Sequence, residues 1–257
     1  MNKAVSSKSP IASVLSIGAS SRITVACLFL LFVLTFWGTI AQVQLGLYAA
    51  QERFFNSFYF LAAGFIPFPG AQLVLWLLFL NLICSLILTF RKYTQWENLG
   101  LLIIHAGLIL YFVAAFLIFH FAQESNVRLA EGEQTNVSTA YQPIVKDIPL
   151  PFTIRLDHFK VEFHPGTDVA KSFESMVTLS TGSLHRQVRI YMNNPLRYKD
   201  YTVYQASYDT DSTGRQHSTL AVVKNGARVL PYLACFTVFF GLAFHFLVQA
   251  FRAKAKI

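Results

Sequence analysis

The chain has 257 residues, of which 54% are hydrophobic and only 13% are charged, whereas about a quarter of the residues in a typical soluble domain are charged. Its mean hydropathy is +0.46. These values exclude a disordered polar chain and a wholly soluble enzyme. They are typical of an integral membrane protein that carries a water-soluble portion.

Four apolar segments contain no Asp, Glu, Lys or Arg and are long enough to cross a bilayer. A helix of about 20 such residues spans a hydrocarbon core of about 30 Å. We therefore predict four transmembrane helices, in the order three and then one. The first is expected to be a retained anchor, because it is longer than the apolar region of a secretory signal and no small-residue cleavage site follows it. The segments are residues 23–41, 72–90, 99–121 and 229–251.

Basic residues gather in the segments at one end of these helices, namely residues 1–22, 91–98 and 252–257. These segments hold eight basic residues and one acid, Glu97, so the positive-inside rule places them in the cytoplasm. We therefore predict a multi-pass protein of the inner (cytoplasmic) membrane with residues 122–228 on the periplasmic side. The formal net charge of +8 then reflects topology and gives no support to nucleic-acid binding. The basic residues are Lys3, Lys8, Arg22, Arg91, Lys92, Arg252, Lys254 and Lys256.

The pattern changes from helical to alternating in residues 122–228. Apolar and polar residues alternate there in short runs separated by turn sequences that contain Gly, Pro or Asn, which is typical of β-strands. The segment is large enough for one small domain with its own core. The expected fold is therefore four transmembrane helices with an extracytoplasmic antiparallel β domain. The predicted strands lie within residues 152–156, 159–163, 172–180, 187–191, 201–207 and 218–223.

The chain offers little for enzyme chemistry of its own. Cys27, Cys84 and Cys235 all lie in the predicted spans, and the β domain contains no cysteine, so a structural disulfide or a zinc site has poor support. Phosphate-binding, hydrolase and metalloprotease motifs are missing from the sequence. We therefore assign no catalytic residue.

Two histidines lie inside predicted spans. His105 follows the boundary residue Asn98 by seven positions, and His245 precedes Arg252 by seven, so we expect the two imidazoles at equal depth on different helices. Neutral imidazole is an axial ligand of haem iron in helical bundles, and Gly241, one turn from His245, would leave room for a flat macrocycle. The alternative is that each ring forms an interhelical hydrogen bond.

Four stretches carry a resemblance to a known family. Residues 96–116 read WENLGLLIIHAGLILYFVAAF and residues 193–209 read NNPLRYKDYTVYQASYD, while WGTIAQ at residues 37–42 and RLAEGE at residues 128–133 add support. The chain resembles the ResB family of system II cytochrome c biogenesis proteins over most of its length. It departs from the family in a shorter outer domain and in KNGAR at residues 224–228, where Asp-Pro-Gly is usual.

The resemblance implies a subunit of a cytochrome c haem lyase complex rather than a complete enzyme. Such a subunit binds haem b, pairs with a polytopic membrane protein of the ResC/CcsA type, and helps to present haem to the Cys-x-x-Cys-His of apocytochrome c. Carried over by position, His105 is the transmembrane haem ligand. His245 is then a second ligand or only a neighbour, with the second ligand on the partner.

Two other functions remain open from the sequence. A b-type haem electron-transfer subunit would also carry histidines on separate spans, although bundles that hold two haems need four. A non-catalytic membrane anchor with a β recognition domain would need no histidine.

Overall fold

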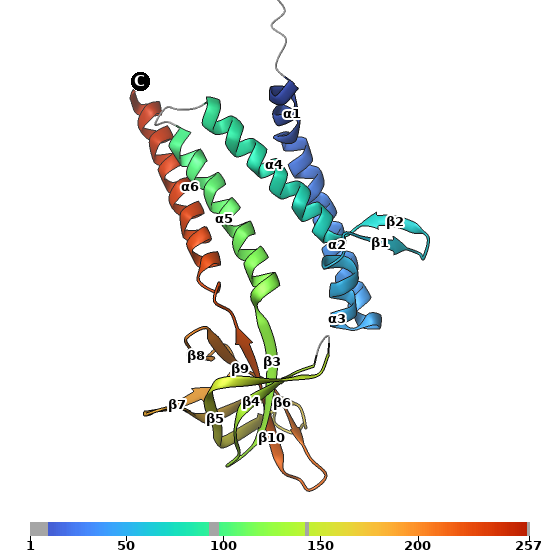
Figure 1. Cartoon of the computed structure of the whole chain (residues 1–257), viewed down its shortest axis with the longest axis vertical. Coiled ribbons are helices and arrows are strands. Elements are labelled where there is room, and N and C mark those ends of the chain that lie inside the picture. The colour runs from blue at the N-terminus through green and yellow to red at the C-terminus, as the bar shows by residue number, and fades with distance from the viewer. Residues whose placement is uncertain (1–9, 93–97, 142–143, 256–257) are drawn as a thin grey trace, which may run out of the picture. The chain divides into compact units, whose positions relative to one another are not determined.

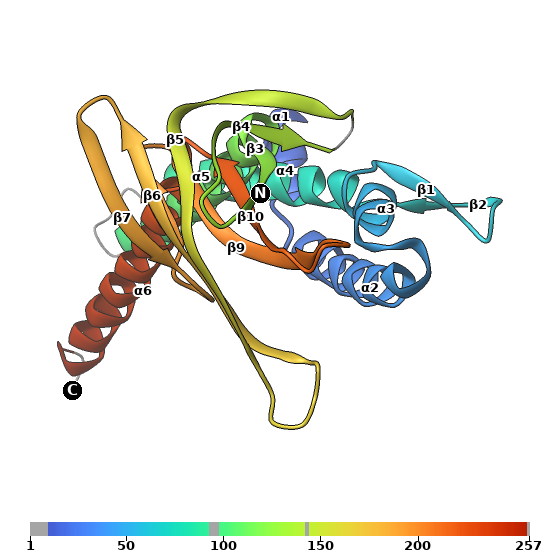
Figure 2. The ribbon, with the colours of Figure 1, turned by 90° about the horizontal axis from the view of Figure 1, so that it is seen from below.

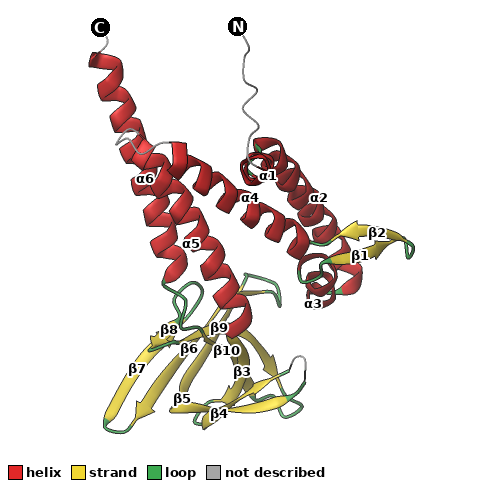
Figure 3. Ribbon diagram, turned by 45° about the horizontal axis from the view of Figure 1, so that its top comes forward, coloured by secondary structure: helices red, strands yellow, loops and turns green. Residues whose placement is uncertain are grey.

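The computed structural model describes residues 10–92, 98–141 and 144–255. Lys3, Lys8, Glu97 and Lys256, on which part of the predicted orientation depends, lie outside the described residues. The chain divides into two compact units, one made of residues 1–114 and 230–257 and the other of residues 115–229. The helices and the large sheet segregate accordingly (Figure 3).

The first unit holds the apolar helices, and all four predicted spans are present. Helices long and apolar enough to cross a membrane cover Pro10–Leu45, Ala71–Phe90, Leu99–Phe121 and Leu230–Ala253. The chain is therefore a membrane protein, and residues 99–121 match the prediction at both ends. The helices are α1 (Pro10–Gly18), α2 (Ser21–Leu45), α3 (Leu47–Ala50), the π-helix η1 (Gln51–Phe55), α4 (Ala71–Lys92), α5 (Leu99–Phe121) and α6 (Leu230–Ala255), with a hairpin of β1 (Tyr59–Ala62) and β2 (Ile66–Pro69) between η1 and α4.

The segment before the first predicted span is partly helical, which the sequence analysis did not predict. Helix α1 ends at Gly18, and the break before α2 is closed by Asn81 of α4. The Asn81 side-chain amide donates to the carbonyls of Gly18 (2.6 Å) and Ser20 (3.1 Å), and its oxygen accepts from Thr24 Oγ1 (2.7 Å). One buried amide therefore satisfies the polar backbone of a break inside an apolar helix pair.

Helices α5 and α6 run side by side (Figures 1 and 3) and meet through glycines. A Cβ on Gly107 would lie 2.8 Å from Val238 Cγ2 and 3.0 Å from the Val238 backbone nitrogen. A Cβ on Gly100 would lie 2.7 Å from the Cβ of His245. Small residues let membrane helices approach to backbone contact, so these glycines set the register of the pair.

The second unit is an antiparallel β domain, as predicted. Its eight-stranded sheet has the order β7-β6-β5-β4-β3-β10-β9-β8, and Figure 2 shows the sheet curling as it is followed from β5 to β9. A bridge between Tyr191 and Asn194 joins the end of β7 to the start of β8, the two edge strands of the sheet. The domain is therefore barrel-like. The strands are β3 (Gln123–Ala130), β4 (Gln134–Ala140), β5 (Lys146–Phe163), β6 (Ala170–Thr181), β7 (Leu184–Ile190), β8 (Leu196–Tyr198), β9 (Tyr201–Thr210) and β10 (Gln216–Lys224).

The interior of the β domain contains an apolar core and a small polar network. Ile154, Leu156 and Val177 are among the fully buried side chains of the core. Ser175 on β6 donates to Gln205 on β9 (2.6 Å), and both side chains bond Ser218 on β10 (2.8 and 2.9 Å). The register of β9 against β10 shifts between Thr219 and Leu220, opposite Gln205 and Ser207. These hydrogen bonds link strands that are not all neighbours in the sheet and so hold the curl.

Candidate functional site

His105 lies near the start of α5 with one ring nitrogen already fixed. Its Nδ1 is 2.8 Å from the carbonyl oxygen of Leu101, one turn earlier. A carbonyl only accepts hydrogen bonds, so Nδ1 carries the proton and the lone pair of Nε2 is left available. Metal-bound histidines are typically oriented by such a bond from the other ring nitrogen. The ring is therefore in the tautomer that a metal ligand requires.

His105 lies on the face of α5 that turns away from α6. At 3.6 residues per turn, His105 is about 140° around the helix from Gly100, which contacts α6. Phe112 follows seven residues later on nearly the same face, and its ring contacts Phe79 of α4 with centroids 5.4 Å apart. The His105 ring thus belongs to the face of α5 on which Phe112 meets α4.

His245 does not lie at the same depth as His105, contrary to the prediction. Gly100 opposes His245 and Gly107 opposes Val238 in the antiparallel pair, so the residue of α6 level with His105 is Phe240. The two histidines are therefore offset by five residues, or about 7.5 Å along the helices. The prediction counted from charged boundary residues, whereas glycine contacts set the register of the pair.

The space expected beside Gly241 is also filled. A Cβ on Gly241 would lie 2.9 Å from both Cγ1 and the backbone nitrogen of Ile104, so α5 itself occupies the place where a macrocycle was expected to lie. His245 Nδ1 is buried and has no hydrogen-bond partner within the described part of the chain. The structure consequently does not bring His105 and His245 together into one site.

The part of the chain that the structure describes shows no cluster of metal-binding side chains beside these histidines. Within residues 10–92, 98–141 and 144–255, no cluster of three or more His, Cys, Asp or Glu side chains is placed to hold a metal ion. Cys27, Cys84 and Cys235 are free thiols. The side chains of Arg91, Lys92 and Lys254, which were predicted to lie on the cytoplasmic side, fall outside the described residues.

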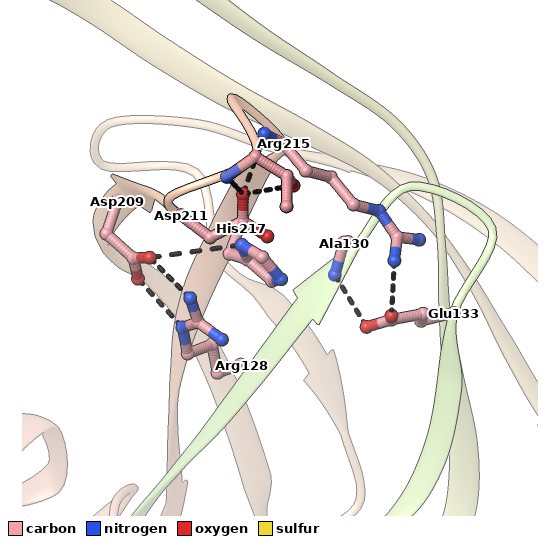
Figure 4. Close-up of polar contacts among 8 residues, drawn as sticks. Arg128, Ala130, Glu133, Asp209, Asp211, Arg215 and His217 are labelled. Atoms are coloured by element: carbon pink, nitrogen blue, oxygen red, sulfur yellow. Dashed lines mark hydrogen bonds and ion pairs between the residues drawn. The ribbon is translucent and has the colours of Figure 1, made fainter.

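The β domain carries a polar cluster that the sequence analysis did not predict (Figure 4). Arg128 at the end of β3 donates two hydrogen bonds to Asp209 at the end of β9 (2.9 and 2.5 Å). His217 of β10 lies beside them with its Nδ1 3.9 Å from the Asp209 carboxylate. The stretch RLAEGE therefore meets the end of the stretch NNPLRYKDYTVYQASYD. Both stretches stood out in the sequence only through the resemblance to a known family, which does not show that their side chains pair.

A second ion pair closes the same end of the domain. Glu133 accepts a hydrogen bond from the backbone nitrogen of Ala130 (2.9 Å) and pairs with Arg215 (3.0 Å). Asp211 accepts bonds from the hydroxyl and the backbone nitrogen of Thr213 (2.6 and 2.8 Å). These contacts fix the two turns that follow β3 and β9.

Comparison with known proteins shows which family the chain belongs to. The model of the ResB-like family matches residues 88–228, more than half of the chain. The chain belongs to the ResB-like family. The ResB-like match includes α5 with His105, the whole β domain and the Arg128–Asp209 pair, whereas α6 with His245 lies beyond it.

Two curated relatives share parts of the sequence. The chain is 32% identical to Protein NrfI of Wolinella succinogenes over 127 residues, which is 49% of this chain and 14% of NrfI. It is 32% identical to the cytochrome c biogenesis protein Ccs1 of Pyropia yezoensis over 63 residues, which is 24% of this chain and 14% of Ccs1. The chain thus spans about one seventh of each relative that it matches.

Among solved structures, the cytochrome c haem lyase CcmF has a loose likeness to this ResB-like chain. The TM-score is 0.37 with 14% sequence identity, covering 85% of this chain and 34% of CcmF. A likeness at this level carries no argument about function.

The carboxylates of the polar cluster predict an acid-sensitive β domain. Arg128 lowers the pKa of Asp209, and the N–H of Ala130 lowers the pKa of Glu133. Because the folded pKa values lie below those of the unfolded chain, this stability is fully present above about pH 4.3 and is lost as the pH falls through the folded values. We expect residues 122–228, expressed alone, to melt at a lower temperature at pH 3 than at pH 7 by circular dichroism. Asp209→Asn should narrow that difference, and equal midpoints at the two pH values would contradict the assignment.

Proposed function

We propose that the chain is a subunit for cytochrome c maturation that binds haem b in the membrane through His105. With a polytopic membrane partner of the ResC/CcsA type, it would help to present the haem to the Cys-x-x-Cys-His of apocytochrome c. Membership of the ResB-like family and the similarity to the cytochrome c biogenesis protein Ccs1 support this role. The observation that carries the haem assignment is the His105 ring, whose Nδ1 is tied to Leu101 and whose Nε2 is available.

In this proposal His105 would hold the haem iron from this chain, and the partner would supply a second ligand. The Leu101 carbonyl holds the imidazole in the Nδ1–H tautomer and limits its rotation, so Nε2 is preorganised for iron. His245 lies on another helix at another level, against Gly100. Haem is the substrate of the assembly, and its vinyl groups form the thioether bonds with the cysteines of the apocytochrome. The role of the ResB-like chain itself would be to hold and orient the haem.

The same proposal includes an orientation in the inner membrane. We expect both termini to be cytoplasmic and residues 122–228 to be periplasmic, because basic residues gather on three flanking segments. An alkaline phosphatase reporter, which is active only outside the cytoplasm, should work when fused at Asn136 or Thr181. Activity of the same reporter fused at Ile257 would contradict the orientation.

An electron-transfer role has weaker support from the geometry. A b-type subunit that held haem within this chain would need two histidines facing one another. His105 and His245 are offset along the α5–α6 pair, and His105 is turned away from α6. A plain membrane anchor would need no histidine, so it leaves the presence of His105 in an otherwise apolar span unexplained.

The visible absorption spectrum of the purified chain tests the proposal. Co-purified with its polytopic partner, the chain should show the Soret and α bands of a six-coordinate haem. The chain purified alone should retain little haem, because one axial ligand is missing. A haem-free complex would argue for the anchor, and a full six-coordinate spectrum from the chain alone would argue for the electron-transfer subunit.

A further inference from the structure

The hairpin between the first two spans exposes an unusual amount of apolar surface. The hairpin of β1 and β2 projects sideways from α2 and α4 (Figure 1). Phe65 at its tip is 74% exposed and Tyr59 is 69% exposed, similar to Phe32 (68%) on the long apolar helix α2. Leu61 adds to this exposed surface, and Phe58 and Ile66 are also exposed next to the strand ends. In water, an apolar surface of this kind marks an interaction site.

The base of the hairpin is fixed rather than loose. Trp37 of α2 packs against Phe54, Phe60 and Phe68 with ring centroids 5.5 to 5.6 Å apart. Phe54 and Phe60 also contact one another at 4.7 Å. Because alternate residues of a strand point to opposite faces, Phe60 points into this aromatic cluster while Tyr59 and Leu61 point away from it. The apolar face is therefore held in a defined direction.

The edges of the hairpin are closed to further strands. Leu61 pairs with Pro67 and Tyr59 with Pro69. Proline has no N–H to donate, so the ladder bonds of β2 come from its other residues and both proline nitrogens face its outer edge. On the outer edge of β1, the carbonyl of Leu61 accepts a hydrogen bond from Arg53 (2.8 Å). Strand addition by a second copy of the chain is thereby disfavoured on either side.

The position of the hairpin in the chain indicates what covers it. It is connected to two apolar spans, α2 and α4, so it must lie at one surface of the membrane. The two charged residues of the connection, Glu52 and Arg53, both belong to η1 and not to the hairpin. Aromatic and aliphatic side chains without charge are favoured where headgroups meet acyl chains.

We infer that the exposed face of this hairpin, defined by Tyr59 and Leu61 together with Phe65 at the tip, inserts into the interfacial layer of the lipid bilayer. The remaining strand carbonyls need polar partners, which the hydrocarbon core lacks. The hairpin therefore lies among the headgroups, with Phe65 reaching about 5–10 Å into the acyl boundary. It would fix the tilt of α2 and α4 and hold the outer end of this helix pair at a set depth.

A fluorescent label at the hairpin tip tests the inference. Phe65→Cys is made in a full-length chain whose three cysteines are replaced by alanine, labelled with bimane, and reconstituted into phosphatidylcholine and phosphatidylglycerol vesicles. Lipids with bromine near the headgroup end of the acyl chain should remove more than half of the emission. Iodide in the buffer should remove little. Tyr59→Cys, on the same face of the hairpin, repeats the test if the first variant does not fold.

Two labelled positions serve as references. Phe32→Cys on α2 should be quenched by brominated lipid, and Ser212→Cys in an exposed turn of the β domain should be quenched by iodide alone. A label at residue 65 that behaves like the one at residue 212 would overturn the inference. Shielding from both quenchers would overturn it as well, because it would mean that protein and not lipid covers the hairpin.

Discussion

A His105→Gly variant, purified with the polytopic partner, should lose its haem, and added imidazole should restore it. Removing the side chain deletes the Nε2 ligand and leaves a vacancy of about the size of imidazole. Soluble imidazole can fill that vacancy, whereas His105→Leu leaves no room for it and should not be rescued. The pyridine haemochrome assay measures haem per complex, and maturation of a reporter cytochrome c measures function.

Matched variants separate ligand loss from loss of helix stability. Glycine within a helix costs about 1 kcal/mol relative to alanine, so Ala106→Gly, at the exposed neighbouring position, carries that cost without removing a ligand. It should keep its haem. His245→Gly should also keep most of its haem, because His245 lies at another level of the α5–α6 pair. A normal haem content in His105→Gly without imidazole would falsify the ligand assignment.

Gly107→Leu should separate α5 from α6. Even a Cβ at this position would lie 3.0 Å from the backbone nitrogen of Val238 and 3.2 Å from the carbonyl oxygen of Ala234, and backbone cannot move aside as a side chain can. Overpacking a tight contact typically costs about 1–3 kcal/mol. We expect a lower thermal midpoint for the full chain in detergent, followed by circular dichroism, together with a lower yield of complex.

The neighbouring position again supplies the control. Ala106 is exposed, so Ala106→Leu adds the same side chain toward lipid and should leave the midpoint unchanged. Equal effects of the two substitutions would mean that the helices do not pair through Gly107.

The transmembrane helices were the most predictable part of the fold. Charged residues are costly in hydrocarbon, so the limits of charge-free runs coincide closely with the helices, and residues 99–121 coincide at both ends. Helix α1 was not predicted because it lies before Arg22, in a charge-free segment after Lys8 that is too short to span a membrane. The break at Gly18 and Ser20 depends on Asn81, more than 60 residues later, which no local pattern reveals.

The strands were predicted less completely than the helices, since β3 and β4 were not among the predicted strands. The reason lies in the residues that these strands bury. Long strands such as β5 and β6 bury large apolar residues on alternate positions, so their pattern is strong. Strands β3 and β4 instead turn Ser125 and Ser138 inward, where the two hydroxyls hydrogen-bond one another (2.9 Å). A buried serine resembles a loop residue in composition, so the inward position of Ser125 and Ser138 was not recognisable in the sequence.

The sequence singled out the candidate histidines but not their placement relative to one another. The two intramembrane histidines stood out because ionisable residues are rare in spans. Their mutual placement was wrong, because it depends on which glycines of α5 and α6 meet. The hydrogen bond from His105 to Leu101 is a local contact over one helical turn, but the choice of rotamer that makes it cannot be read from sequence spacing.

The nitrogen bound to iron is the most direct test of the role of His105. His105→Gly complex would be loaded with haem and rescued with imidazole enriched in ¹⁵N, and pulsed electron paramagnetic resonance would then record the nitrogen couplings of the oxidised iron. If His105 is an axial ligand, a strong axial ¹⁵N coupling replaces one axial ¹⁴N coupling of the unmodified complex. An unchanged set of ¹⁴N couplings would show that both axial ligands come from elsewhere and would contradict the proposal.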